Sequence, residues 1–481
     1  MRLWIGVHLS HASLDTQCPT WRTEPVVVLE HDKAKAVSPC AEAAGVKLGM
    51  RRSGVGALCP AAVLLPYDRH NEKRAMDEVS LALLQYTPEV ALSDDNTLLL
   101  DVSASLSLFG GVRRLFRRVQ ATLEGIGFAA RISVAPTAGG AWLLAARPCR
   151  LRRALRLSTL ARRLDALPCC YLPAARPYCD WLDGIGCATV GSLRALPRAG
   201  LQRRTGKSVL HALDAAYGQA PEVFDWIVAP PEFSGRIELM ERIEYAEALI
   251  FAVRRLIEQL CGWLAARSLA VVRVVFELGH ERGRHARPAT GIALALGTPT
   301  WHADHLLRLL AEHLHHLVLP APVIEVRLHA ADTEARRAAP ADLFPDPGGS
   351  PEDEQRLIEV LMARLGRENV RRPSPVADHR PEIANRWVPV DEKPKMASCI
   401  QAAERPFWLL DEPVALPVKG HRPFYGVALH VVRGPERIED GWWAGLALRD
   451  YYIAQSESGA RYWLYQERGK DTGWFLHGLF A

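Results

Sequence analysis

The first part of the chain alternates between short apolar runs and longer segments with helical spacing. Residues 3–9 and 130–135 are apolar and bounded by polar residues, which predicts two buried strands. Helical spacing from residue 71 to 84 and from 112 to 125 predicts two helices between them. The second helix is amphipathic, and its exposed face is rich in arginine: Arg113, Arg114, Arg117 and Arg118.

A similar alternation returns further along the chain. Apolar positions at helical spacing predict a long helix at residues 245–266, followed by a strand at 270–276. A second helix at 302–317 and a strand at 323–328 complete a pattern that is compatible with a small α/β sandwich. The helix at 302–317 is rich in histidine, and its pairs His302/His305 and His313/His316 indicate either a solvated face or, less favoured, a metal site.

The pattern changes after residue 330. Residues 331–400 are rich in proline, alanine and charge, which predicts a linker with one helix at 352–365. Residues 401–481 are dense in aromatic side chains, and Trp463 and Tyr465 alternate with other residues as in a strand. Such a segment forms either a compact β-rich core or a surface that binds another protein.

Composition narrows the class of protein. A chain of 481 residues with 49% hydrophobic residues is expected to form several domains. The net charge is only +5, so a nucleic-acid surface requires local clustering of basic residues. The ten cysteines lack C-x-x-C pairs, and neither a signal peptide nor a membrane-spanning run is evident. We therefore expect a soluble, cytoplasmic protein with reduced thiols and no membrane partner.

One arginine cluster stands out in the first half of the chain. Between residues 147 and 163 there is no acidic residue, and seven arginines are present: Arg147, Arg150, Arg152, Arg153, Arg156, Arg162 and Arg163. The run is compatible with phosphate binding and equally with a solvated connection.

The motif with the most chemical information is the segment at residues 93–102, Ser-Asp-Asp-Asn-Thr-Leu-Leu-Leu-Asp-Val, followed by Leu-Phe-Gly-Gly at 108–111. It resembles the active-site strand of Y-family (translesion) DNA polymerases, which reads Ser-x-Asp-Glu and then Leu-Asp-Val after two residues. Aligning the Leu-Asp-Val step places Asn96 and Thr97 where the family has its metal-binding Asp-Glu pair. The family's first strand ends in Asp-x-Asp, and His8 and Ser10 occupy those positions here.

Neither pair supplies the carboxylates that hard divalent cations require. In a second register, anchored on Ser93, Asp95-Asn96 becomes the pair and one carboxylate is kept. The Asp-Asp-Asn run also has the composition of a plain turn before a strand. An active enzyme with a rearranged Mg²⁺ site would have to rely on nearby acids: Asp15, Asp94, Asp95 and Asp101.

The resemblance extends along nearly the whole chain and is most similar to the ImuB family, regarded as inactive Y-family relatives. It implies an α/β multidomain fold: a polymerase-like right hand plus a C-terminal β-rich aromatic domain. The expected divisions are a palm at 1–165 with fingers inserted at about 30–90, a thumb at 166–228, a little finger at 229–330, a linker at 331–400 and a partner-binding segment at 401–481. The turn at 136–141 also lacks the Asn-Lys step that active relatives place near the nucleotide phosphates.

The expected thumb has helix-hairpin-helix character. Gly184 and Gly186 would expose backbone N–H groups at a helix start, where the helix dipole favours a DNA phosphate. Three basic residues follow shortly afterwards and would add contacts to the DNA backbone: Arg203, Arg204 and Lys207.

The remaining expectations concern partners. Asp342, Leu343 and Phe344 resemble the end of the Gln-x-x-Leu-Phe peptide that docks on the bacterial β sliding clamp, although Pro340 replaces the glutamine. The tail resembles the ImuB carboxy-terminal segment, with four candidate contact residues: Trp442, Trp443, Tyr451 and Tyr452. The family implies a non-catalytic adaptor in damage-induced translesion synthesis. It would bind primer-template DNA, the clamp, a RecA-like accessory protein and an error-prone C-family DNA polymerase. The alternative is an active low-fidelity polymerase.

Overall fold

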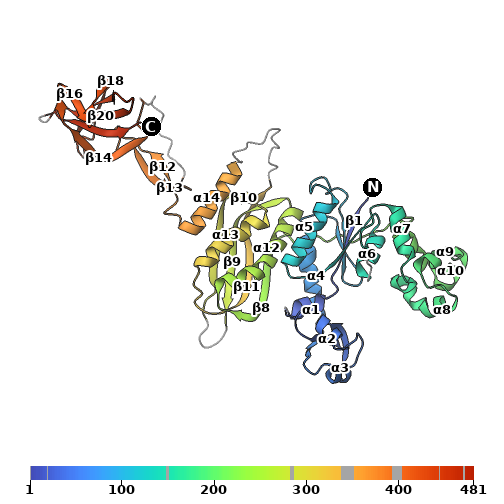
Figure 1. The fold of residues 1–481 in the computed structure, drawn as a ribbon. Helices are drawn as coiled ribbons and strands as arrows, with labels where there is room; N and C mark the ends of the chain where they lie inside the picture. The colour runs from blue at the N-terminus through green and yellow to red at the C-terminus, as the bar shows by residue number, and fades with distance from the viewer. Residues whose placement is uncertain are drawn as a thin grey trace. The chain divides into compact units, whose positions relative to one another are not determined.

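The computed structural model describes residues 2–18, 20–147, 151–281, 287–336, 351–392, 404–443, 445–469 and 472–480. The chain forms two compact units, residues 1–360 and 361–481, and each is described by itself (Figure 1). Within these ranges no helix combines the length and the apolar character that crossing a membrane demands.

A four-stranded antiparallel sheet organises the start of the chain, and we call it the first sheet. Its strand order is β5 (Val90–Ser93), β6 (Thr97–Asp101), β1 (Trp4–His8) and β7 (Arg131–Ala135). The strands predicted at 3–9 and 130–135 are therefore confirmed, and they are direct neighbours. Because β1 is central and buried throughout, whatever stands at its end is held rigidly against β6 and β7.

Helices cover both faces of the first sheet. On one face, α4 (Arg69–Leu83) and α5 (Val112–Gly125) pack on alternate apolar residues of β1 and β6. On the other face lies α6 (Ala138–Ala146). Gly6 permits that approach, since a Cβ there would stand 2.7 Å from the carbonyl oxygen of Ala141. The helices predicted at 71–84 and 112–125 are confirmed within two residues.

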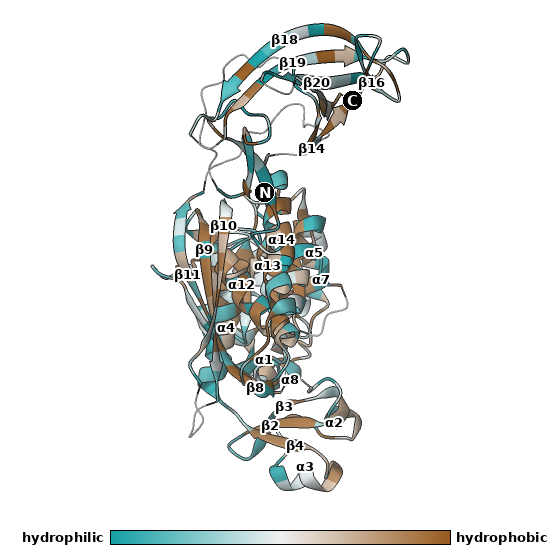
Figure 2. Cartoon of the chain, turned by 90° about the vertical axis from the view of Figure 1, so that its left-hand side faces the viewer, coloured by the Kyte–Doolittle hydropathy of each residue, from teal (hydrophilic) through white to brown (hydrophobic). Residues whose placement is uncertain are grey.

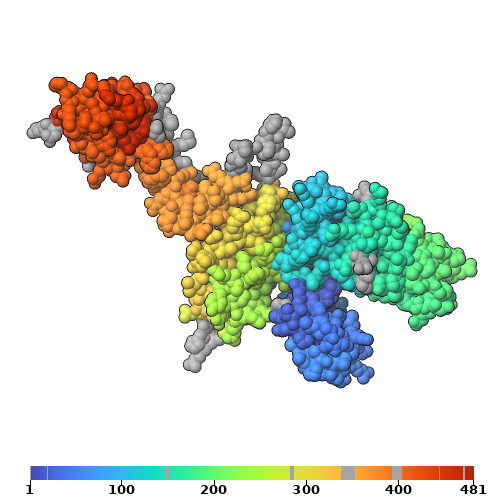
Figure 3. All heavy atoms as spheres, in the orientation of Figure 1, coloured from blue at the N-terminus to red at the C-terminus, as the bar shows by residue number. Residues whose placement is uncertain are grey.

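A small insert follows β1 and has its own apolar centre. Its helices and strands are α1 (Ala12–Gln17), β2 (Val26–Glu30), β3 (Lys33–Val37), α2 (Pro39–Ala43), α3 (Arg52–Leu58) and β4 (Val63–Pro66). The strand order is β3-β2-β4. Buried valines from its strands and loops pack together, so the insert is a lobe of its own, shown in blue in Figure 3.

A helical module follows the first sheet. It contains α7 (Leu157–Asp165), α8 (Cys179–Gly184), α9 (Val190–Ala195), α10 (Arg198–Thr205) and α11 (Lys207–Ala216). Its apolar core is continuous with α6 and with Trp4 of β1. The helical module is therefore anchored on the face of the first sheet opposite to α4 and α5.

A second antiparallel sheet follows, with the order β10 (Thr290–Thr300), β9 (Leu269–His280), β11 (Val323–Ala335) and β8 (Ser234–Ile243). It packs against α12 (Leu249–Ala266), and α13 (Ala303–His316) packs on α12. The brown colour of β9 and α12 in Figure 2 marks this apolar layer. Both predicted helices and both predicted strands are confirmed, whereas β8 and β10 were not predicted.

Contact between α12 and α4 joins the second sheet to the first. At Gly262 of α12 the helices approach so closely that an added Cβ would stand 1.8 Å from the carbonyl oxygen of Leu81. Nearby, Nε of Arg255 donates a hydrogen bond of 2.7 Å to the carboxylate of Glu78 on α4. The glycine therefore marks a backbone-to-backbone contact that no larger residue fits.

The expectation that the histidine-rich helix presents only a solvated face is wrong for His305. This side chain is buried, and its Nε2 lies 2.7 Å from Oε2 of Glu359 on α14 (Pro351–Leu365). Oε1 of Glu359 accepts a hydrogen bond of 2.7 Å from the backbone N–H of Gly297. Burial opposes the charged carboxylate, but these hydrogen bonds hold the pKa of Glu359 below its ordinary value.

The second unit is rich in strands. Its main antiparallel sheet has the order β14 (Trp408–Leu416), β21 (Trp474–Leu479), β20 (Arg461–Glu467), β19 (Ala447–Gln455) and β18 (His430–Asp440). A hairpin of β12 (Arg371–Pro375) and β13 (Asn385–Pro389) lies inside the segment that was predicted to be a linker. The prolines and charges of this segment suggested irregular chain, but residues 371–375 pair in antiparallel register with residues 385–389.

Aromatic side chains of this unit divide into a core and an exposed pair. Tyr451 is 1% exposed, its ring stacks 4.1 Å from that of Trp463, and its hydroxyl lies 2.8 Å from Nδ1 of His477. The prediction that Tyr451 contacts a partner is therefore wrong, because its surface is already used in the core. Trp442 and Trp443 are 79% and 59% exposed, while Tyr452 packs on Trp474.

Candidate functional site

The residues at the expected metal-ligand positions meet at one end of β1 and β6. His8, the last residue of β1, pairs with Thr97, the first residue of β6, and on its other side with Arg131 of β7. Asn96 immediately precedes β6, and its carbonyl oxygen accepts a hydrogen bond of 3.0 Å from the N–H of Leu9. The structure thus brings the two separated sequence motifs together.

His8 and Thr97 form a closed hydrogen-bond network. Nδ1 of His8 lies 3.0 Å from the Thr97 hydroxyl, which is also 3.0 Å from the carbonyl oxygen of Asp95. A hydroxyl has a single proton, so both bonds form only when Thr97 donates to Asp95 and Nδ1 of His8 carries a proton and donates to Thr97. Both side chains are buried, so this network occupies the space between the strands.

The electrostatics of this network oppose a cation. Burial first, and then the neighbouring Arg131 guanidinium, lower the pKa of His8 to about 4. His8 is therefore a neutral imidazole at physiological pH. The same two causes lower the pKa of His11, the neighbour of Ser10. A positive charge on β7 thus lies beside the strand end where the family motif has carboxylates.

Ser10 and Asn96 are also engaged by neighbours. The Ser10 hydroxyl lies 2.8 Å from Nδ1 of His11. Nδ2 of Asn96 donates a hydrogen bond of 2.9 Å to Oε1 of Glu72 on α4. Oε1 of Glu72 also accepts a hydrogen bond of 2.8 Å from the Ser13 hydroxyl, and its Oε2 accepts one of 2.5 Å from Tyr67. The Glu72 carboxylate, which bonds to Asn96, therefore already accepts three hydrogen bonds from the chain itself.

Asp95, the carboxylate that the second register would keep, is held by two arginines. Its Oδ2 lies 2.7 Å from Nη2 of Arg147, at the end of α6, and 2.8 Å from Nη2 of Arg176 in the helical module. Asp94, Asp95 and Asn96 form the turn between β5 and β6, and Asp95 and Asn96 adopt φ values of 53° and 49°. The turn interpretation is therefore confirmed, and Asp95 ties this turn to the helical module.

The remaining acids lie elsewhere. Asp101 pairs with Trp4 at the opposite end of β6, four residues from Thr97, which corresponds to about 13 Å along a strand. Asp15 is a partly buried residue of α1, and its carboxylate accepts hydrogen bonds of 2.9 Å from the Trp21 indole and 3.0 Å from the N–H of Ala129. Burial raises the pKa of Asp15 to about 6 despite these donors.

The residues at this position do not fit a pair of magnesium ions. Mg²⁺ in phosphoryl-transfer sites is bound through carboxylates, and two-metal chemistry requires groups that hold both ions. Here the donors are a neutral imidazole, two hydroxyls and a carboxamide, beside Arg131. Within the described ranges there is no cluster of three or more His, Cys, Asp or Glu side chains suited to a metal.

The start of α6, where active relatives place a lysine near the nucleotide phosphates, is also occupied. Thr137 caps the helix by accepting a hydrogen bond of 3.1 Å from the N–H of Gly140. The N–H of Gly139 donates a hydrogen bond of 3.3 Å to the carboxylate of Glu222. A carboxylate of the chain itself thus uses the donors that a helix start offers to an anion.

We expect Asp95→Ala to destabilise the chain by about 1 kcal/mol, because two partly exposed ion pairs are lost. The measurement is the urea midpoint of unfolding, with Asp94→Ala as the matched control. Asp94 lies in the same turn but contributes only its backbone carbonyl, which accepts a hydrogen bond of 3.0 Å from the Trp142 indole. Equal midpoints for the two variants would contradict the anchoring role of Asp95.

A second candidate site lies on the helical module. Gly184 and Gly186 flank the exposed Ile185 at the end of α8, and a Cβ at either glycine would meet no atom within 4 Å. Arg203 and Arg204 lie at the end of α10, and Lys207 begins α11. The structure places all five predicted DNA-contact residues on one module and exposes them. The expectation that the two glycines stand at a helix start is wrong, because Gly184 is the last residue of α8 and the N–H of Gly186 donates a hydrogen bond of 3.0 Å to the carbonyl oxygen of Asp183.

Two contacts connect these helix ends. The Tyr178 hydroxyl donates a hydrogen bond of 3.3 Å to the carbonyl oxygen of Thr205, and the Arg204 guanidinium lies 5.5 Å from the centre of the Trp181 ring. Within the described residues, no ion pair involves the three cations Arg203, Arg204 and Lys207. Their charges are therefore exposed to solvent.

Sequence reasoning missed several residues that shape these sites. Arg131 lies beside the end of β1, Arg176 binds Asp95 in the turn before β6, and Glu222 binds the start of α6. Their own neighbours in sequence give no signal of these contacts. The sequence cluster at 147–163 contained Arg147, but nothing pointed to its pairing with Asp95. The clamp-like residues Asp342, Leu343 and Phe344 lie outside the described residues.

Comparisons with known proteins agree with the resemblance. Residues 11–146 match the family model described as the impB/mucB/samB family. Protein ImuB of Caulobacter vibrioides (strain NA1000 / CB15N) is 29% identical over 468 residues, which cover 91% of this chain and 100% of that protein. The protein of the same name from strain ATCC 19089 / CIP 103742 / CB 15 gives the same values.

Solved structures of DNA polymerases are also similar. A Dbh ternary complex is 16% identical, with a TM-score of 0.40, over 68% of this chain and 98% of that chain. A DinB family error-prone DNA polymerase from Sulfolobus solfataricus is 16% identical, with a TM-score of 0.40, over 70% of this chain and 100% of that chain.

Proposed function

We propose, from the premise that this chain is an ImuB-like homologue of the Y-family DNA polymerases, that it is a non-catalytic adaptor in damage-induced translesion synthesis. In this role it binds primer-template DNA and recruits other proteins to it, while a different enzyme adds the nucleotides. The first sheet corresponds to the palm, the insert to the fingers, the helical module to the thumb and the second sheet to the little finger.

One observation supports the absence of catalysis above all others. His8 and Thr97 stand at the adjoining ends of β1 and β6 and bond to each other across them. Neither side chain can bind a divalent cation as a carboxylate does, and Arg131 adds a positive charge beside them. This arrangement lacks the carboxylate ligands that nucleotide transfer by two metal ions requires.

The retained helix ends of the helical module support the DNA-binding part of the proposal. Exposed glycines at the end of α8 allow a phosphate to approach the backbone closely, and three cations without ion partners in the described residues lie on neighbouring helix ends. We therefore assign DNA binding to Gly184, Gly186, Arg203, Arg204 and Lys207.

The experiment that tests this function is primer extension by the purified chain with Mg²⁺ or Mn²⁺, combined with DNA binding on the same substrate. We expect binding without incorporation of any nucleotide above the background of a protein-free reaction. Extension that Asp95→Ala abolishes would overturn the proposal and establish the alternative, a low-fidelity polymerase with a rearranged metal site. Extension that survives Asp95→Ala calls for the same test with alanine at Asp15, Asp94 and Asp101, and loss of extension in any of these variants would also overturn the proposal. Extension that survives all four substitutions would indicate a contaminating polymerase, which a second purification step would remove.

Docking on the β sliding clamp forms a separate part of the proposal. We expect the double substitution Leu343→Ala and Phe344→Ala to weaken clamp binding by at least about tenfold, because both apolar anchors of the peptide are lost. Pro340→Gln restores the residue that the peptide motif expects and should tighten binding. The measurement is surface plasmon resonance on immobilised clamp. Unchanged affinity in both variants would place the clamp contact elsewhere.

The exposed pair Trp442 and Trp443, together with Tyr452 at the edge of the aromatic core, is the proposed contact for the RecA-like accessory protein and the C-family polymerase. Large aromatic side chains that are exposed side by side are typical of interface anchors.

A further inference from the structure

Strand β7 is an edge strand whose outer side is only partly covered. It pairs with β1 on its inner side, and no strand lies beyond it in the sheet order. On the outer side, the N–H of Val134 donates a hydrogen bond of 2.8 Å to the carbonyl oxygen of Arg152. The carbonyl oxygen of Val134 accepts another, also of 2.8 Å, from the N–H of Ala154. The chain at 152–154 therefore covers this end of β7 as a short parallel partner.

Among the described residues, the other end of β7 has no such partner. Backbone groups alternate in direction along a strand, so Ile132, two residues before Val134, presents its N–H and C=O on the same outer side. The N–H of Ala129 donates a hydrogen bond of 3.0 Å to Asp15, away from the outer side of β7. Because backbone groups alternate along an extended chain, we infer that the N–H and C=O of Ala130 point to the outer side. Within the described ranges no backbone group meets Ile132 on its outer side. An uncovered edge of this kind is a template for an added strand.

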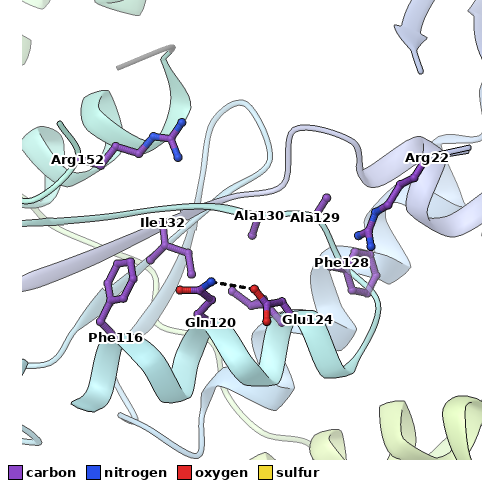
Figure 4. Close-up of a pocket in the computed structure, with 10 residues that line it drawn as sticks. Arg22, Phe116, Gln120, Glu124, Phe128, Ala129, Ala130, Ile132 and Arg152 are labelled. Atoms are coloured by element: carbon purple, nitrogen blue, oxygen red, sulfur yellow. Dashed lines mark hydrogen bonds between the residues drawn. The ribbon is translucent and has the colours of Figure 1, made fainter. Parts of the chain in front are cut away.

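A groove runs along this uncovered edge. A cavity of about 470 Å³ is lined by Ala129, Ala130 and Ile132 from the strand side and by Phe116, Leu123 and Phe128 from α5 and the turn after it. Figure 4 shows Phe116, Gln120 and Glu124 on α5 facing the strand across this space. A neighbouring cavity of about 320 Å³ shares Phe116, Ile132 and Arg152 with it, so the groove continues toward residue 151. Its floor offers apolar surface to side chains of an added strand.

The ends of the groove are basic. Arg22 lies at one end and Arg152 at the other, as Figure 4 shows, and Arg153 and Arg163 line the continuation. The Arg153 guanidinium lies 3.8 Å from the centre of the Phe116 ring. Among the described residues that line either cavity, Glu124 is the only acid, and it accepts a hydrogen bond of 2.8 Å from Gln120. Nε of Arg152 is buried and has no hydrogen-bond partner in the described part of the chain.

We propose that this groove receives an extended acidic peptide from a partner protein, which adds to the first sheet as a strand beside Ala130 and Ile132. The peptide backbone would satisfy the outward N–H and C=O groups of β7. Alternate apolar side chains would enter the cavity beside Phe116, and the intervening acidic side chains would meet Arg22 and Arg152. Strand addition combines these three features, whereas a nucleic acid would use only the arginines.

This proposal is independent of the function proposed above. It uses neither the strand ends at His8 and Thr97 nor the DNA-contact residues of the helical module. A chain that fails to bind DNA can still bind the peptide, and the reverse also holds. The two proposals can therefore fail separately.

The test is fluorescence anisotropy of the full chain with a labelled synthetic peptide of about eight alternating Glu and Val residues, the common length of a strand being five to six. A first control peptide has the same composition with the Glu and Val residues in separate blocks. Two further control peptides have N-methyl groups on alternate backbone nitrogens, one on the odd-numbered residues and the other on the even-numbered residues. N-methylation removes the strand hydrogen bonds but preserves the charge.

We expect the alternating peptide to bind at least about tenfold more tightly than the block peptide. It should exceed one of the two N-methylated peptides by the same factor, because only one of them loses the nitrogens that face β7. The double charge reversal Arg22→Glu and Arg152→Glu should weaken binding at least about fivefold. The control is Arg114→Glu together with Arg117→Glu, which makes the same change of charge at α5 residues that line neither cavity. Ala130→Pro, which removes one outward N–H at an edge, should also weaken binding without loss of the fold.

Hydrogen exchange gives the structural readout. The alternating peptide should protect the amide of Ile132, which ladder bonds to β1 do not use, and leave Ser133 unchanged. Equal affinity for the alternating and block peptides, or displacement of the peptide by a single-stranded oligonucleotide at matched charge concentration, would overturn strand addition. Each of those outcomes would show a groove that responds to charge alone.

Discussion

Charge reversal at Arg203, Arg204 and Lys207 is expected to lower the affinity for primer-template DNA about a hundredfold at moderate salt. Each cation that neutralises a phosphate contributes about −0.9 to the slope of log K against log salt concentration for duplex DNA. Loss of three such contacts should therefore reduce the steepness of that slope by roughly 2 to 3. The measurement is a salt titration of DNA binding by fluorescence anisotropy.

The structure explains why these three cations should act together. They occupy the end of α10 and the start of α11, and all are exposed. The contact of Arg204 with Trp181 connects these cations to α8, which ends at Gly184, two residues before Gly186. A phosphate that reaches the exposed glycine backbone thus lies on the same module as the three positive charges.

A matched control separates local contact from net charge. Charge reversal at Arg113, Arg114 and Arg117 makes the same change on α5, outside the helical module. We expect a smaller loss of affinity and little change of slope for this control. An unaltered slope in the Arg203, Arg204 and Lys207 variant would remove these residues from the DNA interface.

Gly262→Ala is expected to destabilise the first unit by at least about 3 kcal/mol. The added Cβ would stand 1.8 Å from the Leu81 carbonyl oxygen and 3.0 Å from Cα of Ala82, and both are backbone atoms of the α4 region. Backbone cannot rotate away as a flexible side chain does, so α12 must shift and the packing between the two sheets must open. The measurement is the urea midpoint of unfolding.

Gly200→Ala serves as the control for this prediction. Gly200 lies within α10, where a Cβ would meet no atom within 4 Å, and alanine raises helix propensity. We expect Gly200→Ala to be neutral or slightly stabilising. Equal midpoints for Gly262→Ala and the unmodified chain would show that α12 and α4 are not held together at this point.

Periodicity predicted most helices of the first unit, since α5, α12 and α13 each have one apolar face that packs on the rest of the chain. It missed β8 and β10, although β10 buries every second residue from Ile292 to Leu296, because the exposed residues between them are alanines and the run is apolar throughout. In β8 the alternation is short and ends at Leu239. It failed also for β12 and β13, where prolines and charges suggested a linker.

Two short motifs sufficed to predict that His8 and Thr97 belong to one candidate site, and the structure does pair them. What surrounds these two residues could not be predicted. Arg131 reaches His8 through pairing of β1 with β7, and Arg176 reaches Asp95 across 81 positions of chain. Contacts of this kind depend on the packing of modules and leave no pattern in the local sequence. The same holds for Tyr451, whose burial depends on three neighbouring strands.

The anchoring of Asp95 between Arg147 and Arg176 has a consequence for any attempt to engineer a metal site at the ends of β1 and β6. Carboxylates introduced at positions 8 and 97 would find the Asp95 carboxylate fixed in a contact with the helical module. Use of Asp95 as a metal ligand would require the turn between β5 and β6 to release that contact. The metal ion and the attachment of the helical module would therefore compete for the same side chain.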